Sequence, residues 1–264
     1  MHLRALRHAI FFILLALGLA LAYGPVLTAA QTVNLDAYVI LKNLSANQNV
    51  AQYLSRLLSY QGIDIQPVRD LSLWIDLWAF ENFGLQTGIL QNLGYWLMTC
   101  LTLGRVIKLL FPALPDNFTC KLVGLFALYP LFGSTLAWGM GRKHILATMF
   151  ILLATRQFLL CCQRPAQRWL HSLLFTLAYY CSILAQPITL LWPVWALFYA
   201  WNKGMRKKFY WCLSCLWAAL VLVATLNYQY YQESAVFKQS YNMKLSADVS
   251  PSDMVLALGH YTYQ

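Results

Sequence analysis

The sequence predicts an all-α integral membrane protein, a polytopic helical bundle of about seven spans with a long outer first loop that carries interfacial helices. Its 264 residues are 60% hydrophobic, their mean hydropathy is +0.53, and 11% of them are charged. Soluble domains average about 25% charged residues, so a soluble core of this size could not hide so much apolar surface. The bilayer is then the solvent, which excludes a soluble enzyme and a DNA-binding domain.

Apolar runs of bilayer-crossing length recur along the chain, since a spanning helix needs roughly 20 mostly apolar residues. The seven expected spans are 8–28, 86–104, 122–140, 144–162, 169–185, 187–201 and 209–228. The dipeptide Gln186-Pro187 separates the fifth span from the sixth, because proline disfavours a helical conformation in the residue before it. A retained anchor is the favoured interpretation of the first run. A cleaved signal peptide ending near Ala20-Leu21-Ala22 is the alternative.

The charges orient these spans. With the N-terminus in the cytoplasm, 12 of the 19 basic residues fall on the cytoplasmic side, and the other 7 are spread over longer outer segments. Cytoplasmic loops are generally enriched in Lys and Arg, so the net charge of +10 indicates membrane topology rather than nucleic-acid binding. Eight of the nine acids fall outside, and none lies within an expected span, which argues against a transporter. We expect a bacterial inner membrane rather than the endoplasmic reticulum.

Seven cysteines lie in or next to apolar runs: Cys100, Cys120, Cys161, Cys162, Cys181, Cys212 and Cys215. An odd number placed in this way does not suit a secreted disulfide framework. The pair Cys212-x-x-Cys215 has the spacing of metal ligands, but no second Cys or His pair accompanies it. Small apolar packing residues are therefore the preferred interpretation, and no metal site is predicted.

The outer loop, residues 29–85, is too long for a simple connection and contains two expected helices. The first follows Ser45, and an apolar stripe from Val50 to Leu58 gives it the pattern of an amphipathic helix. A position on the membrane surface and packing against the spans are equally compatible with that pattern.

The second loop helix is expected from about Asp70 to Asn82. Leu71, Trp74, Ile75 and Trp78 form its apolar face, while Ser72 and Asp76, four residues apart, share another face, with Arg69 near the same line. The polar stripe is expected to look either into a protein cleft or into solvent.

Four stretches in a particular order carry a family resemblance: 34–43 (NLDAYVILKN), 66–76 (QPVRDLSLWID), 127–143 (ALYPLFGSTLAWGMGRK) and 184–187 (LAQP). Over roughly residues 8–202 the chain resembles the membrane part of the GT-C superfamily glycosyltransferases. It is most similar to the transmembrane and tetratricopeptide-repeat O-mannosyltransferases and their bacterial relatives. The resemblance implies a GT-C-like membrane domain over 1–228. It also implies an outer C-terminal segment, 229–264, that is truncated relative to the family.

The family implies a polyprenyl-phosphate sugar as donor and transfer to an acceptor at the outer or lumenal face. On that basis Asp36 is the candidate catalytic base, and Arg142 and Lys143 are the candidate ligands of the donor phosphate. Asp76, Arg69 and Asn43 are candidate supporting polar residues. A divalent metal near Asp76 is left open. The alternatives are that Asp36 caps a turn and that the basic pair is a solvated helix end.

Several polar residues of the family pattern are replaced in this chain. One of its paired acids is Leu35, its Arg-Pro is Gln66-Pro67, and its Arg-Lys-Asp ends in His144. Its His-Pro-x-His-x-Glu motif reads YPLFGS over 129–134, and its Ser-Lys-Pro motif reads AQP over 185–187. Two functions therefore stay open: a glycosyltransferase with a reduced polar site, or a non-catalytic relative acting as a membrane scaffold or partner subunit. Expected partners are membrane lipids, a lipid-linked sugar and protein subunits, without nucleic acid.

Overall fold

The computed structural model describes residues 10–11, 13–21, 51–52, 66–83, 88–129, 135–136 and 141–204. Compact packing divides the chain into two units, and all the helices named below belong to the first of them. Within the described residues the regular structure is entirely helical. The α-helices are α4 (Pro67–Phe83), α5 (Gly88–Leu110), α6 (Asp116–Ala127), α8 (Arg142–Gln163), α9 (Arg168–Ala185) and α10 (Trp192–Asn202). Two short 3₁₀ helices, η2 (Pro165–Gln167) and η3 (Pro187–Leu191), flank α9.

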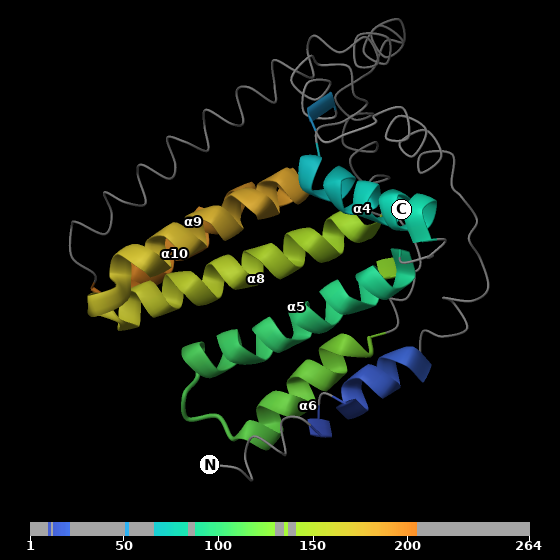
Figure 1. Cartoon of the computed structure of the whole chain (residues 1–264). Helices are drawn as coiled ribbons and strands as arrows, with labels where there is room; N and C mark the ends of the chain where they lie inside the picture. Colours follow the sequence, from blue (N-terminus) through green and yellow to red (C-terminus); the bar gives the residue numbers. More distant parts are fainter. Residues whose placement is uncertain are drawn as a thin grey trace, which may run out of the picture. The chain divides into compact units, whose positions relative to one another are not determined.

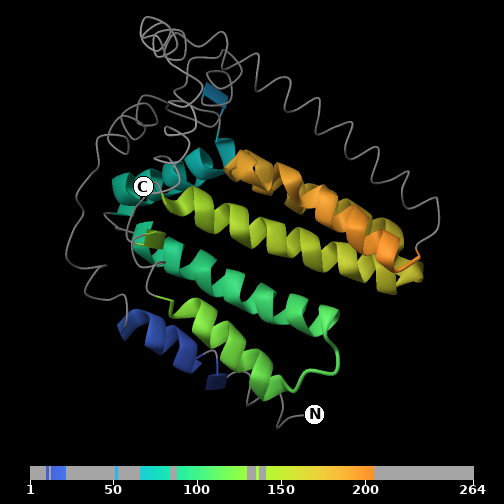
Figure 2. The ribbon, with the colours of Figure 1, turned by 180° about the vertical axis from the view of Figure 1, so that it is seen from behind.

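The long helices lie side by side in the order α9, α8, α5, α6, followed by the helical residues 10–11 and 13–21 (Figure 1; Figure 2). Helices α5 and α8 run parallel. Asn92 contacts Arg142 near their first turns, and Gln163 donates a hydrogen bond to the Leu109 carbonyl at their last turns. Helix α4 contacts α8 and α9 and lies at the end where α5 and α8 begin (Figure 1). That end, called here the α4 end, is distinct from the opposite end, where α6 begins.

Prolines set several helix ends. Pro67 occupies the first position of α4, where its missing N–H costs no hydrogen bond, so this helix begins three residues before the expected Asp70. Gln186, before Pro187, is extended with φ −161° and ψ 127°, which confirms the break expected between the fifth and sixth spans. At the end of α10, Gly204 takes the left-handed conformation, φ +60°, that commonly closes a helix.

The expected third span, 122–140, is wrong as one continuous helix. Helix α6 already begins at Asp116 and ends at Ala127, and Leu128 and Tyr129 are not helical. The physical reason is Pro130, since helices usually end at or before the residue that precedes a proline. The helix starts after Pro115, whose backbone is extended, and Asp116 adds a negative charge to its first turn, which complements the helix dipole.

The second, fourth and fifth expected spans agree with α5, α8 and α9 to within a few residues, except that α5 continues six residues beyond 104 to Leu110. The sixth, 187–201, is divided between the 3₁₀ helix η3 and the 11-residue helix α10. Residues 10–11 and 13–21 of the first span are helical. The seventh span, 209–228, lies outside the described residues. So does most of the first loop helix, of which residues 51–52 are described and helical.

Apolar side chains and small residues fill the bundle. One cluster joins residues 10–21, α5, α6 and α8 through Leu19, Trp96, Ala127 and Ile145. A second joins α5, α8 and α10 around Phe158, which lies 5.6 Å from the ring of Trp192. Cys100 and Cys161 are fully buried in these clusters. Cys212 and Cys215 lie outside the described residues.

Among the residues that the structure describes, two helices are long and apolar enough to cross a bilayer, over Leu90–Leu110 and Arg142–Gln163. At about 1.5 Å per residue, the 23 residues of α5 and the 22 of α8 extend roughly 33–35 Å, slightly more than a hydrocarbon core of about 30 Å. By length and composition, α5 and α8 can therefore each cross a bilayer.

Candidate functional site

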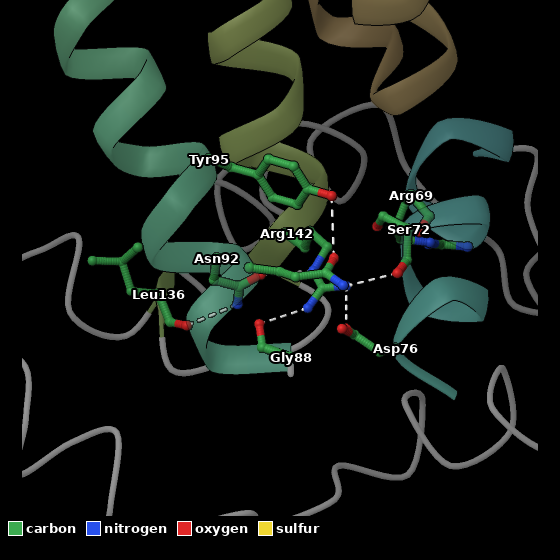
Figure 3. A network of polar contacts seen from close by, with 9 residues as sticks. Arg69, Ser72, Asp76, Gly88, Asn92, Tyr95, Leu136 and Arg142 are labelled. Carbon is green, nitrogen blue, oxygen red and sulfur yellow. Dashed lines mark hydrogen bonds and ion pairs between the residues drawn. The ribbon is translucent and has the colours of Figure 1, made fainter. Parts of the chain in front are cut away.

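A buried arginine organises the α4 end of the bundle (Figure 3). Arg142 is the first residue of α8, and 1% of its surface is exposed. Its Nε donates to Asn92 Oδ1 (2.6 Å) and its Nη2 to the Gly88 carbonyl (2.7 Å). Its Nη1 donates to the Ser72 carbonyl (3.1 Å) and forms an ion pair with Asp76 Oδ2. All three nitrogens of the guanidinium are therefore engaged by the protein.

Two residues of α5 complete the surroundings of this guanidinium. Asn92 is 2% exposed, and its Nδ2 donates to the Leu136 carbonyl (2.9 Å), so the amide ties α5 both to Arg142 and to the segment before α8. At Gly88 a Cβ atom would lie 3.3 Å from Asp76 Oδ2 and 3.4 Å from Arg142 Nη2. Glycine thus lets the start of α5 approach the ion pair closely enough for its carbonyl to accept a hydrogen bond.

A second buried arginine pairs within α4 itself. Arg69 is 1% exposed, and its Nε and Nη2 both lie 2.6 Å from Asp70 Oδ1. Its Nη1 donates to Gln66 Oε1 (3.0 Å), and its carbonyl accepts from the Ser72 hydroxyl (2.6 Å). The α4 end therefore holds two arginine–carboxylate pairs, each of which neutralises its own charge, as buried ions require.

Helix α4 turns its polar side toward the protein and its apolar side outward. Arg69, Asp70 and Ser72 are buried. The exposed large apolar residues of the same helix are Leu71, Ile75, Trp78, Phe80 and Phe83. Of the two environments expected for the polar stripe, the described structure therefore places it against the protein interior.

Stretches separated in sequence meet at this end. Asp76 belongs to the second of the four family-like stretches, and Arg142 to the third. Val68 of the second stretch and Ala185 of the fourth pack in one apolar cluster with Leu146 and Ala147 of α8. Described residues of the second, third and fourth stretches are thus neighbours in space.

The predicted site residues are brought together in part. Asp76 and Arg142 form an ion pair, whereas Arg69 bonds Asp70 and Gln66. Lys143, the second residue of α8, is half-buried. Asp36 and Asn43 lie outside the described residues, so their predicted roles as base and supporting residue stay predictions.

Sequence reasoning missed Asn92 and Gly88 as members of this cluster. The available signal was an amide, Asn92, inside an apolar run: a buried amide must find hydrogen-bond partners, and here they come from Arg142 and Leu136. Nothing in the local sequence marks Gly88, since its role depends on the approach of another helix.

The arrangement has a definite chemical consequence. These contacts occupy four of the five N–H groups of the guanidinium, so a phosphate that bound it through two hydrogen bonds would have to displace Asp76, Asn92 or a backbone carbonyl. In the described structure this guanidinium connects α4, α5 and α8. Within the described residues, no group of three or more His, Cys, Asp or Glu side chains could hold a metal ion.

Comparison with known proteins adds no relative to this picture. No family profile, curated protein or solved structure matches the chain.

Proposed function

We propose that the chain is a multi-pass membrane protein with a GT-C-like arrangement of helices that acts as a non-catalytic scaffold or partner subunit. The observation that carries this proposal is the state of Arg142. The residue that the family resemblance assigns to the donor phosphate is instead buried, donates four of its five N–H groups to internal acceptors and joins three helices.

The apolar exterior supports the membrane part of the proposal. Large apolar side chains are more than half exposed on residues 10–21, α5, α6, α9 and α10, for example Leu21, Leu90, Leu125, Leu177 and Phe198. Soluble monomers rarely expose such extensive apolar surface, whereas hydrocarbon solvates it without cost. Polar groups in the bundle bond inward, as with the Ser182 hydroxyl and the Ala147 carbonyl (3.0 Å), which suits helix association in lipid.

Helix α4 supports the proposal further. Its polar residues bond within the bundle while its exposed apolar residues include Trp78 and Phe83. Aromatic residues of this kind favour the boundary between lipid and water. We infer that α4 lies at the outer membrane surface and closes the outer end of the bundle.

A polyprenyl-phosphate-sugar glycosyltransferase is the second candidate. The contacts between the family-like stretches favour it, through the ion pair of Asp76 with Arg142 and through the apolar cluster that holds Val68 and Ala185. Under that function Asp36 would act as base, and Lys143 would be the remaining candidate for the donor phosphate.

An activity assay separates the two candidates. Purified protein in lipid nanodiscs, given a panel of polyprenyl-phosphate sugars, is expected to show background transfer, equal to that of an Asp36→Asn variant. A positioned base typically contributes about 10²–10⁴-fold, so its removal from an active enzyme would be obvious. Robust turnover that Asp36→Asn abolishes would overturn the scaffold and establish the transferase.

The proposed topology predicts a labelling pattern. In a cysteine-free background, a cysteine introduced at Ser45 is expected to react with a membrane-impermeant maleimide in intact cells. One introduced at Lys203 should react only after permeabilisation, because positive loops stay in the cytoplasm. The reverse pattern would invert the assigned orientation.

A further inference from the structure

The opposite end of the bundle contains a cavity of about 510 Å³. It lies between residues 10–21, the last turns of α5 and α8, and the start of α6. Its charged lining consists of four basic side chains and one acidic side chain: Arg105, Lys108, Arg156, Arg164 and Asp116. The rest of the wall is mostly apolar and includes Leu101 and Val123. Four cations against one anion leave three positive charges around one hollow.

The acidic residue is already committed to the lysine. Lys108 Nζ lies 2.6 Å from Asp116 Oδ1 and donates to the Leu114 carbonyl (2.5 Å), which ties the end of α5 to the start of α6. Both partners of this pair are partly exposed, so its contribution to stability is small. Its structural effect is to remove the acid as a counter-ion for the three arginines.

The three arginines have no such partner. Within the described residues, Arg105, Arg156 and Arg164 make no hydrogen bond or ion pair through their side chains. They come from α5, from α8 and from the residue that caps α8. Solvated arginines at helix ends could diverge into water. Arg105 and Arg164 are exposed and Arg156 is half-buried, and all three line the same cavity.

We propose that this cavity binds the phosphate group of an anionic ligand, with a membrane phospholipid as the source that the surroundings favour. The planar guanidinium binds phosphate oxygens through paired hydrogen bonds, and three of them at one place match a phosphate diester or monoester. The apolar wall beside the charges suits the acyl chains of a lipid better than a fully hydrated ion. Basic pockets between helices at the cytoplasmic face are typical sites for anionic headgroups.

The site is separate from the function proposed above. It lies at the far ends of α5 and α8 from Asp76 and Arg142, so substitutions here leave the α4 end untouched. In the proposed orientation it faces the cytoplasmic leaflet, whereas a sugar donor would act at the outer face. If the cavity bound no phosphate ligand, the scaffold proposal would still stand. If the chain proved to be a glycosyltransferase, the proposed phosphate site would still stand.

Calorimetric titration of the full chain in a neutral detergent tests the proposal. The probes are dihexanoyl phosphatidylglycerol, dihexanoyl phosphatidylcholine and inorganic phosphate. The variant is Arg105→Gln with Arg156→Gln and Arg164→Gln. Its matched control removes three exposed cations that do not line the cavity, through Lys121→Gln, Arg168→Gln and Lys203→Gln.

Phosphatidylglycerol is expected to bind more tightly than phosphatidylcholine. At about fivefold per basic residue, the triple arginine variant should lose affinity by on the order of 100-fold, and the control triple should lose little. Weak or absent binding of inorganic phosphate would identify the lipid as the source. Binding of inorganic phosphate that equals that of phosphatidylglycerol, and that the arginine variant removes, would support the phosphate site and assign it to a soluble ligand.

Equal binding of the two lipids, with no loss in the arginine variant, would overturn the proposal. Should the triple variant not fold, the single variants Arg105→Gln and Arg164→Gln replace it, because both residues are exposed. Each single variant is expected to lower the affinity for phosphatidylglycerol about fivefold. Arg156→Lys keeps the charge but removes the paired donors, so it should weaken phosphatidylglycerol binding less than Arg156→Gln does.

Discussion

An Arg142→Met variant is expected to lose about 3–5 kcal/mol of its free energy of unfolding. The methionine would leave Asp76 as a partly buried carboxylate without its cation, and Asn92 and two backbone carbonyls without their donor. Because these partners belong to both α4 and α5, the packing of three helices should weaken together. Unfolding by sodium dodecyl sulfate in mixed micelles, followed by tryptophan fluorescence, measures the change.

A matched control and a double variant define the origin of that loss. Lys121→Met removes an exposed cation of α6 and should change stability little. In Asp76→Asn with Arg142→Met, no unpaired charge remains, so the double variant should be less destabilised than the sum of the singles, by about 0.5–3 kcal/mol. An Arg142→Met protein as stable as Lys121→Met, but defective in binding a polyprenyl-phosphate sugar, would show that the arginine serves a ligand and not the fold.

A Gly141→Ala variant is expected to lose about 1–3 kcal/mol of its free energy of unfolding. A Cβ atom at Gly141 would overlap the Thr135 carbonyl oxygen and lie 3.0 Å from the Thr135 Cα. Because both atoms belong to the backbone, the segment before α8 would have to move, and Arg142 is the next residue. The conformation of Gly141 is an ordinary helical one, φ −63° and ψ −18°, so the restriction is one of space.

Gly94→Ala is the matched control for this prediction. Gly94 lies inside α5, and a Cβ there meets nothing within 4 Å. Alanine is the better helix former by about 1 kcal/mol, so this variant should be unchanged or slightly more stable. The same unfolding measurement applies to both. Equal stability of Gly141→Ala and Gly94→Ala would contradict the close approach of Gly141 to Thr135.

The sequence by itself determined the helices and several of their ends, because these depend on neighbours within one or two turns. The break at Pro187, the end of α6 ahead of Pro130 and the polar stripe of α4 all follow from local rules. The 122–140 span was predicted wrongly because hydropathy averaged over a window outweighed the proline within it. The convergence of Asp76 with Arg142 was expected through the family resemblance, and it was not deduced from spacing.

Only the tertiary structure decided what these residues contact. Asp76 and Arg142 are 66 positions apart, and whether the arginine faces a cavity or becomes buried depends on how three helices pack. The same holds for Asn92 and Gly88, whose roles arise from the close approach of α5 to α4 and α8. Arg105, Arg156 and Arg164 looked like ordinary cytoplasmic charges in the sequence. Their meeting at one cavity follows from the parallel course of α5 and α8, which brings the last turns of both helices to the same end.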